Sequence, residues 1–328
     1  MKVLVTGGAG FIGSHLTDAL IRQGDHVVVI DDVSTGNWEN LRALEECPQL
    51  ECIHGSVGDE QLVRRVLADV DEVYHLAAAV GVALIAQQPI KTIETNIYTT
   101  QLLLDEMMRQ NRIDGRPRRF FLASSSEVYG KNPKETFTEE DDLVFGSTSR
   151  PRWSYGASKA IDEFLALACW NEHRIPVVVG RFFNVVGPRQ TGAYGMVLPR
   201  FVNAALAGGK LVVHDDGRQQ RCFAHVSDVV SAVVSLLSKP AAQGRVFNIG
   251  SDVPVSIVRL AEKVIAAAGS AATIQFQSYA DAYNTDFEDI RRRVPDLTRI
   301  RTVIDYVPQY DLDQIIQELI DEKRSRQP

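Results

Sequence analysis

The sequence predicts an α/β protein built on a doubly wound parallel sheet, followed by a smaller C-terminal α/β region. Three observations predict this fold. Short apolar runs alternate with segments of helical periodicity through the first half of the chain. These runs are β-branched and almost continuously apolar, as in strands that are buried on both faces. A glycine-rich turn also follows the first run directly. Parallel strands with helices on both faces account for all three observations.

Each element is expected from its own pattern. The predicted strands are Lys2–Thr6, His26–Asp31, Leu50–His54, Glu72–Leu76, Arg119–Ser124 and Pro176–Phe182. Between them, apolar residues at spacings of three and four predict helices over Ile12–Gln23, Glu60–Ala68 and Ile93–Gln110. From Gly187 onward, loops rich in glycine and proline dominate and the strands become shorter. We therefore assign residues 1–186 mainly to the large sheet domain. Residues 187–328 belong mainly to a smaller ligand-covering region, with the chain crossing back near residues 220–250.

Composition narrows the class of protein. The chain has 328 residues, of which 45% are hydrophobic and 23% charged, and its net charge is -7, so nucleic acid is not an expected partner. No segment approaches the roughly 20 apolar residues of a membrane span, and no signal peptide is visible. The four cysteines have no CxxC spacing and fit no metal site, which indicates free thiols in a reducing compartment. We expect a cytoplasmic protein without a metal ion.

The first motif predicts a dinucleotide site. In "VLVTGGAGFIGSHL", Gly7, Gly10 and Gly13 form a G-x-x-G-x-x-G pattern, with a predicted strand before it and a predicted helix after it. The first permits a tight turn, the second allows the backbone to approach a pyrophosphate, and the third lets helix and strand pack closely. The phosphates would lie at the helix N-terminus. Asp31 ends the next strand, where its carboxylate would bind both ribose hydroxyls and repel a 2′-phosphate, so NAD is favoured over NADP. The expected contacts here are Gly7, Gly10, Phe11, Ile12, Gly13, Asp31 and Asp32.

A second motif, "SYGASKA", predicts a catalytic pair. Tyr155 and Lys159 are four residues apart on a predicted helix and so share one face. A tyrosine with its ordinary pKa is a poor base at neutral pH. We expect the Lys159 ammonium and a positively charged nicotinamide ring to lower the pKa of Tyr155. The phenolate could then take a proton from a sugar hydroxyl while hydride leaves the same carbon.

These motifs together resemble the extended short-chain dehydrogenases/reductases, in the branch that modifies nucleotide sugars. The glycine motif, "HLAA", "SSSEVYG", Tyr155 with Lys159, "RFFNVVGPRQ" and "RCFAHVSD" follow the family's order over nearly the whole chain. The resemblance implies a Rossmann domain that binds NAD, with further cofactor contacts from Leu76, Ala77, Ala78 and Asn96. Ser56 departs from the family, because relatives often have Asp at this position near the adenine.

The resemblance also implies a nucleotide-diphosphate sugar as substrate, with UDP as the expected nucleotide. Ser125 looks like the residue that binds the C4 hydroxyl beside Tyr155, and its neighbour Ser126 is a further expected sugar contact. Asn184, Arg221 and Arg293 resemble residues that bind the diphosphate, with Arg189 as another candidate, since guanidinium suits phosphate. His214 occupies a position where relatives often have an aromatic residue that stacks on the base, although an ordinary surface histidine is the alternative. Arg291 and Arg292 are expected to face solvent.

The residues leave the reaction open after the first step. In this family Tyr155 would remove the O4 proton while NAD+ takes hydride from C4, and the enzymes differ in what happens to the 4-keto sugar. Ser126 stands where 4,6-dehydratases have Asp, which argues against that reaction. Glu127 and "RPRWSYGASK" resemble UDP-glucuronate decarboxylases, whereas "FNVVGPRQTGAYGMVLPRF" resembles 4-epimerases.

We expect 4-epimerisation of an NDP-hexose or hexuronate, with oxidative decarboxylation of UDP-glucuronate as the alternative. A dinucleotide-binding sensor without turnover is a third hypothesis, disfavoured by Tyr155, Lys159 and Ser125. Glu127 is also a candidate catalytic residue, and a pair between Glu127 and Arg293 would serve either enzyme.

The family commonly forms homodimers through a four-helix bundle, and two segments of this chain fit that role. The predicted helices Ile93–Arg109 and Tyr155–His173 hold more apolar residues than one buried face requires. Ordinary core packing is the alternative explanation. The residues concerned are Leu102, Leu103, Leu104 and Met107 on the first helix, and Phe164, Leu165, Leu167 and Ala168 on the second.

Overall fold

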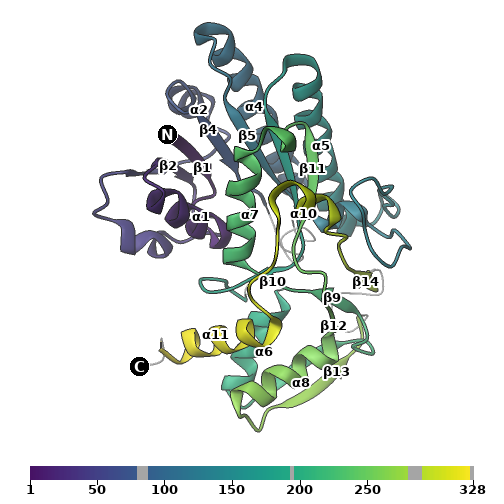
Figure 1. Ribbon diagram of the computed structural model, residues 1–328. Coiled ribbons are helices and arrows are strands. Elements are labelled where there is room, and N and C mark those ends of the chain that lie inside the picture. The colour runs from purple at the N-terminus through teal and green to yellow at the C-terminus, as the bar shows by residue number, and fades with distance from the viewer. Residues whose placement is uncertain (80–87, 193–195, 280–289, 326–328) are drawn as a thin grey trace.

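The computed structural model describes residues 1–79, 88–192, 196–279 and 290–325 (Figure 1). Within these residues, seven parallel strands form one sheet in the order β11-β6-β5-β4-β1-β2-β3. The strands are β1 (Lys2–Thr6), β2 (His26–Asp31), β3 (Leu50–His54), β4 (Glu72–His75), β5 (Arg119–Ser125), β6 (Val177–Phe182) and β11 (Arg245–Ile249). The first six confirm the predicted strands to within one residue. The seventh, β11, was not predicted.

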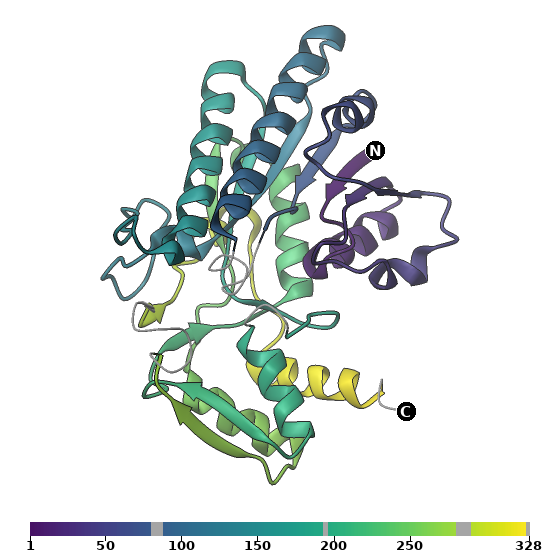
Figure 2. The same ribbon diagram turned by 180° about the vertical axis from the view of Figure 1, so that it is seen from behind.

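Helices cover both faces of this sheet (Figures 1 and 2), as the alternating pattern predicts. Helices α1 (Phe11–Arg22), α7 (Val226–Ser238) and α10 (Thr298–Ile304) pack on one face. Helices α2 (Glu60–Leu67), α4 (Pro89–Asp114) and α5 (Ser154–His173) pack on the other. Leu16 and Leu20 of α1 show why, since residues four apart share one side of a helix and both are buried against the sheet. The doubly wound fold is therefore confirmed.

Helix α4 is longer than its pattern suggested. It begins at Pro89, which suits the first helical position because proline has a fixed φ and lacks only an N–H that would have no helical partner. It ends at Asp114, and Gly115 follows with a φ of 70°. A left-handed residue after the last turn is a common way to end a helix, and glycine adopts it without strain.

A smaller region lies below the sheet in Figure 1 and has its own apolar core. Helices α6 (Val197–Leu206), α8 (Ile257–Ala268) and α11 (Leu312–Ser325) pack around a parallel pair, β8 (Lys210–His214) and β13 (Thr273–Gln277). Between this region and the sheet, β7 (Val185–Val186) pairs with β10 (Ala224–His225). Strand β9 (Gln220–Cys222) pairs with β12 (Pro254–Ser256) and with β14 (Arg292–Arg293). Short 3₁₀ helices are η1 (Trp38–Leu44), η2 (Ser126–Tyr129), η3 (Pro151–Trp153) and η4 (Pro240–Ala242).

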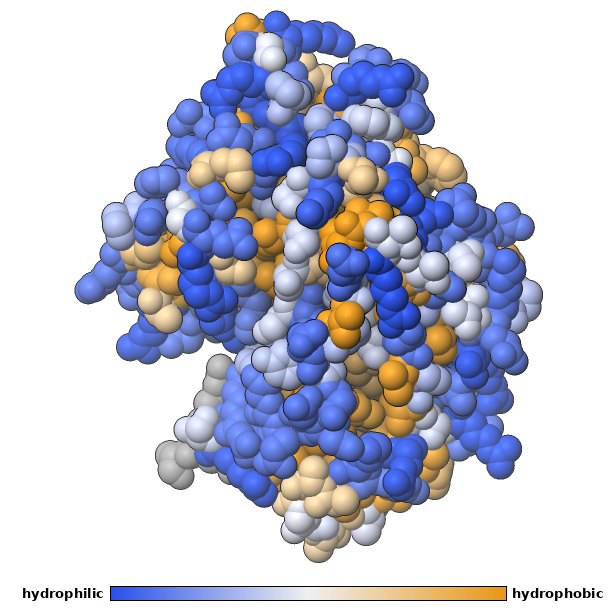
Figure 3. All heavy atoms as spheres, viewed as in Figure 1, coloured by the Kyte–Doolittle hydropathy of each residue, from blue (hydrophilic) through white to orange (hydrophobic). Residues whose placement is uncertain are grey.

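The surface seen in Figure 3 is mostly hydrophilic, with apolar residues gathered toward the middle of the face. None of the helices in the described ranges is long and apolar enough to cross a membrane. All four cysteines are free.

Candidate active site

A cavity of about 1240 Å³ opens at the carboxyl ends of the strands and reaches into the smaller region. Its walls include the glycine turn after β1, the ends of β2, β4 and β5, the start of α5, and residues of β8, β9 and β14. Ligands of doubly wound sheets bind at this edge, where the strand order reverses. Because the volume exceeds the roughly 300–1,000 Å³ of a typical single-ligand site, there is room for two ligands side by side.

The glycine turn leaves no space for side chains. Gly7 has a φ of 71°, and a Cβ there would lie 2.8 Å from the amide nitrogen of Ala77. A Cβ on Gly13 would lie 2.1 Å from the carbonyl oxygen of Gly7. Helix α1 therefore starts directly against β1, with its first N–H groups directed at the cavity edge. Gly7, Gly10, Phe11, Ile12 and Gly13 all line the cavity, as the motif predicts.

Asp31 holds the turn in place from the end of β2. Its Oδ2 accepts the Ala9 N–H at 2.9 Å, and its Oδ1 accepts the Val33 N–H at 2.8 Å. Burial raises the pKa of Asp31, and these backbone hydrogen bonds oppose the rise. Each oxygen retains a second lone pair for a ligand hydroxyl. Asp31 and Asp32 both line the cavity, so the residues present fit the ribose of a dinucleotide.

Four further residues were expected to contact the cofactor, and three of them line the cavity: Leu76, Ala77 and Ala78, directly after β4. Asn96 does not line it. Its side chain is buried, accepts the Ala79 N–H at 2.8 Å and donates to the Ser158 hydroxyl at 3.1 Å. A direct contact of Asn96 with the cofactor stays a prediction, and in the described residues its side chain ties the chain after β4 to α5.

The catalytic pair lies on α5, and both side chains line the cavity. The Ser125 hydroxyl, at the end of β5, hydrogen-bonds the Tyr155 phenol. Burial raises the pKa of Tyr155, the Glu127 carboxylate raises it further, and the bond to Ser125 opposes the rise. The Lys159 ammonium donates to Asp162 Oδ2 at 3.2 Å. The protein groups therefore keep the pKa of Tyr155 above its ordinary value, contrary to the expected effect of Lys159.

Glu127 is held by two arginines. Arg293 Nη1 lies 2.5 Å from Glu127 Oε1, and Arg152 Nη1 lies 2.6 Å from Glu127 Oε2. Burial would raise the pKa of Glu127, but the charges of Arg293, Arg152 and Arg221 hold it at about 2. The hypothesised pair between Glu127 and Arg293 is present. Arg293 also donates weakly to the Ser126 hydroxyl, at 3.4 Å.

Arg152 is the functional candidate that sequence reasoning missed. Its side chain is 9% exposed, lines the cavity and stands in η3, three residues before Tyr155. It lies inside the quoted motif "RPRWSYGASK". The sequence did contain a reason to consider Arg152, because a carboxylate such as Glu127 beside an anionic substrate needs cationic partners.

The expected diphosphate contacts all line the cavity but differ in their other partners. Asn184 donates to the Cys222 carbonyl at 2.8 Å, and Arg221 donates to the Gln220 carbonyl at 2.9 Å. Arg189 pairs with Asp18 of α1 at 2.6 Å, so its guanidinium also links the loop after β7 to the sheet domain. Of the two arginines expected to face solvent, Arg291 forms an exposed ion pair with Asp216.

His214 lies at the far end of the cavity and stacks on Tyr279, with ring centroids 5.4 Å apart. The Gln219 amide donates to the Tyr279 hydroxyl and to the His214 carbonyl, both at 2.9 Å. Tyr279 and Gln219 also line the cavity and were not predicted, because β8 and the segment after β13 meet only in the folded chain. Two stacked rings form a platform suited to a planar base. Residues 193–195 of the loop compared with epimerases lie outside the described residues.

Comparisons with known proteins find similar proteins over nearly the whole chain. Residues 4–319 match the family described as GDP-mannose 4,6 dehydratase. The chain is 36% identical to a UDP-N-acetyl-alpha-D-glucosaminuronate decarboxylase of Bacillus cytotoxicus, over 97% of this chain and 96% of that protein. It is 33% identical to UDP-glucuronic acid decarboxylase 1 of Arabidopsis thaliana, over 99% of this chain and 70% of that one. The structure of Thermus thermophilus UDP-glucose 4-epimerase in complex with NAD superposes with a TM-score of 0.85 and 26% identity, covering 99% of this chain and 100% of that one.

Proposed function

We propose that this chain, which belongs to the GDP-mannose 4,6-dehydratase family of extended short-chain dehydrogenases/reductases, is an NAD-dependent decarboxylase of a UDP-linked hexuronate. The family comprises nucleotide-sugar epimerases, dehydratases and decarboxylases. The proposal replaces our expectation of 4-epimerisation by the alternative given beside it. One observation carries it: Glu127 is clamped between Arg152 and Arg293 next to the catalytic pair.

The charge around Glu127 supports a carboxylate-bearing substrate. The charges of Arg293, Arg152 and Arg221 all act on the Glu127 carboxylate, so several cationic groups gather around one anion. The diphosphate of any nucleotide sugar would compensate part of this positive charge. Arg152 binds the second oxygen of Glu127 from η3, just before the helix that carries Tyr155. The sugar ring would lie on this side of Glu127. A C6 carboxylate could form a charge-assisted hydrogen bond with Arg152, which a neutral hexose could not.

The relatives support the same choice. Two proteins that cover nearly all of this chain, each more than 30% identical, are decarboxylases of UDP-linked hexuronates. The epimerase structure shares the fold over the same length at lower identity. Because enzymes of both kinds begin by oxidising C4, the shared fold is expected and does not discriminate between them.

The chemistry needs few groups from the protein. NAD+ held by the glycine turn and Asp31 would supply the hydride acceptor for oxidation of the sugar at C4. Tyr155 takes the O4 proton, with Ser125 holding the same oxygen. The C5–C6 bond then breaks, its electron pair flows toward the new C4 ketone, and carbon dioxide leaves. A proton from water at C5 gives a 4-keto pentose. Return of hydride to C4, with the Tyr155 proton returning to O4, would then give the pentose, so that the net change is the loss of carbon dioxide alone. Arg152 would orient the carboxylate before the bond breaks, and Arg221 and Arg293 would hold the diphosphate.

We also propose a homodimer through α4 and α5. The prediction of the interface residues is partly corrected, because three of them are buried against the sheet: Leu103, Leu104 and Met107. Phe164 of α5, which was expected, is 69% exposed, and two apolar side chains that were not expected are also exposed: Tyr98 (50%) on α4 and Ile161 (45%) on α5. A second copy of the chain covering these helices would bury them.

Product analysis tests the reaction. The enzyme is incubated with NAD+ and, in parallel, UDP-glucuronate, UDP-N-acetylglucosaminuronate and UDP-glucose, and the products are followed by mass spectrometry and NMR. We expect a hexuronate to lose the mass of carbon dioxide. Unchanged mass with inverted C4 configuration would establish the epimerase instead. Binding of NAD+ without turnover of any nucleotide sugar would favour the sensor.

A further inference from the structure

Asp162 is a buried acid that the proposed chemistry does not use. It lies on α5, one turn after Lys159, and its side chain is fully buried, while that of Lys159 is 2% exposed. The Lys159 ammonium donates to its Oδ2 at 3.2 Å. A charge taken out of water this completely requires a close partner of opposite charge. Each of these two groups therefore depends on the other.

The ion pair between Lys159 and Asp162 lacks some of the hydrogen bonds that a purely structural buried ion pair needs. Buried ion pairs are stabilising only when further hydrogen bonds satisfy their remaining lone pairs. Asp162 Oδ1 has no hydrogen-bond partner among the described residues. Glu163, the next residue, shows the contrast: its two oxygens accept bonds from Arg181 and from the Ser124 hydroxyl. An incompletely satisfied buried carboxylate calls for a functional explanation.

The carboxylate also acts on the catalytic tyrosine. Tyr155 precedes Lys159 by one turn, and both line the cavity. After burial and the Glu127 carboxylate, Asp162 is a further cause that raises the pKa of Tyr155. For Asp162 itself, burial raises the pKa, and the charge and hydrogen bond of Lys159 oppose the rise.

The other groups around the pair are few. The titratable neighbours of Lys159 and Asp162 are His75 of β4 and Tyr155 and Glu163 of α5, and Glu127 of η2 acts in turn on Tyr155. Burial, and then the Lys159 charge, lower the pKa of His75 well below its ordinary value, so His75 is neutral. Helix α4 faces the pair with the uncharged residues Thr99 and Thr100. Asp162 is thus the carboxylate in direct contact with Lys159 among the described residues.

We propose that Asp162 is a positioning residue of the catalytic pair: its buried carboxylate shares the charge of the Lys159 ammonium and so limits how strongly Lys159 draws the proton away from Tyr155. The base then releases its proton only when further positive charge reaches the cavity. A bound nicotinamide ring in its oxidised form supplies such a charge. The inference rests on the C4 oxidation within the proposed function, a step that decarboxylases and epimerases share.

The test is the ionisation of Tyr155 in Asp162→Asn. Asparagine keeps the shape and a hydrogen-bond acceptor for Lys159 and removes the negative charge. Ultraviolet difference absorbance of the phenolate is titrated against pH with NAD+ bound, and the same variant carrying Tyr155→Phe is subtracted to isolate this tyrosine. We expect the Tyr155 titration to move down by roughly one pH unit. The acid limb of the kcat profile should move with it.

A matched control is Glu163→Gln, which removes a buried charge from the same helix without touching Lys159. It should lower the melting temperature and leave the Tyr155 titration in place. An unmoved or raised titration in Asp162→Asn would overturn the proposal, and a loss of melting temperature alone would assign Asp162 a structural role. The titration needs no sugar turnover, so failure of decarboxylation and failure of this inference remain distinguishable.

Discussion

Glu127 illustrates how single contacts decide the chemistry at the residue scale. A carboxylate facing a cavity for an anionic substrate would repel its ligand. Here Arg152 and Arg293 hold the two oxygens separately, so the charge is compensated before any substrate arrives. The site therefore combines an ionised carboxylate with two arginines that can be probed one at a time.

The first prediction concerns Arg152→Met, which keeps the apolar stem and removes the charge. We expect kcat/KM for the hexuronate to fall roughly 100-fold, because one partner of a nearly buried charge pair is lost. C4 oxidation of UDP-glucose, measured as enzyme-bound NADH, should fall much less, since that sugar has no carboxylate.

Arg150→Met is the control for this variant, because Arg150 is two residues away and does not line the cavity. Equal losses on the acidic and the neutral sugar would show that Arg152 does not recognise the carboxylate.

The second prediction follows from the pKa of Glu127, which is about 2 in the folded chain. This value lies below the ordinary glutamate value of about 4.3, so ionisation stabilises the folded state. The contribution is complete above the unfolded pKa and is lost as the pH falls through the folded pKa. Between about pH 5 and about pH 2, the melting temperature of the wild-type chain should therefore approach that of Glu127→Gln.

Glu60→Gln is the control for this pH dependence, since Glu60 forms an exposed pair with Arg64. Its stability should stay within about 1 kcal/mol of wild type. A gap between wild type and Glu127→Gln that is independent of pH would contradict the assigned charge state.

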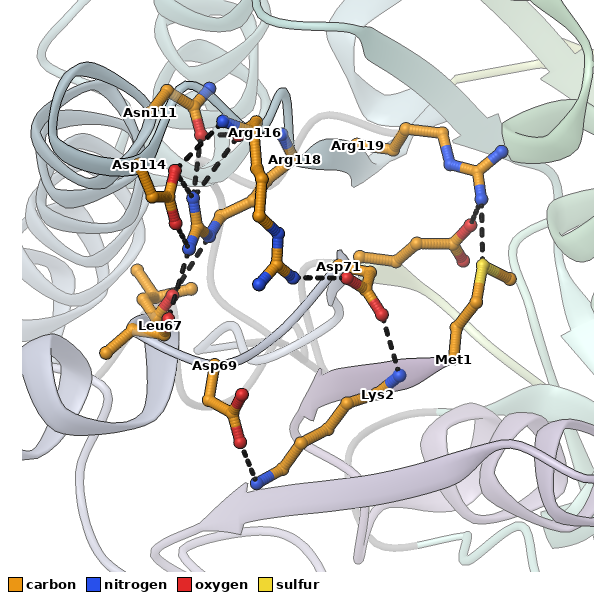
Figure 4. A network of polar contacts seen from close by, with 12 residues as sticks. Met1, Lys2, Leu67, Asp69, Asp71, Asn111, Asp114, Arg116, Arg118 and Arg119 are labelled. Atoms are coloured by element: carbon orange, nitrogen blue, oxygen red, sulfur yellow. Dashed lines mark hydrogen bonds and ion pairs between the residues drawn. The ribbon is translucent and has the colours of Figure 1, made fainter.

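At the scale of elements, one buried arginine joins the ends of two helices at the opposite edge of the sheet (Figure 4). Arg118 is 1% exposed and stands just before β5. It donates to the Leu67 and Ala68 carbonyls at the end of α2, and to Asn111 and Asp114 in the last turn of α4. Carbonyls at a helix end have no partner within the helix, so this guanidinium satisfies several at once.

The third prediction is that Arg118→Met lowers the free energy of unfolding by about 3 kcal/mol, because it leaves buried carbonyls unpaired and Asp114 without its partner. Urea titration followed by circular dichroism measures the change. Arg116→Met is the matched control: its guanidinium is about half exposed and pairs with Asp71 on the surface, so its loss should cost less than about 1 kcal/mol. Equal effects of the two substitutions would refute the role given to Arg118.

At the scale of the whole molecule, the open question is what covers α4 and α5. The fourth prediction is that the chain is a dimer in solution and that Phe164→Glu makes it a monomer. A charge placed on a side chain that is 69% exposed does not disturb the core, but it would be buried in the interface. Size-exclusion chromatography with light scattering measures the mass.

Val253→Glu is the control, because Val253 is 71% exposed and lies outside these helices. It should remain dimeric. A wild-type monomer, or a dimer that persists in Phe164→Glu, would place the interface elsewhere or exclude it.

Local patterns in the sequence determined most of the fold and the cofactor half of the site. Strand and helix periodicity is a property of neighbouring residues, so six strands of the sheet were predicted to within one residue. The glycine turn and Asp31 were found for the same reason, because the chemistry of the motif lies in consecutive elements. Tyr155 and Lys159 were recognised from a spacing of four, which a helix converts directly into proximity.

Only the tertiary structure determines which residues that are distant along the chain come into contact. Arg152 and Arg293 contact the same carboxylate from η3 and from β14, and Tyr279 reaches His214 across a strand pair. Asn96 was placed in the site by resemblance, and only the folded chain shows that its side chain hydrogen-bonds Ala79 and Ser158. No local pattern encodes such contacts, because they depend on how the smaller region packs against the sheet. The choice between a neutral and an acidic sugar depends on the same packing, since it sets how many cations surround Glu127.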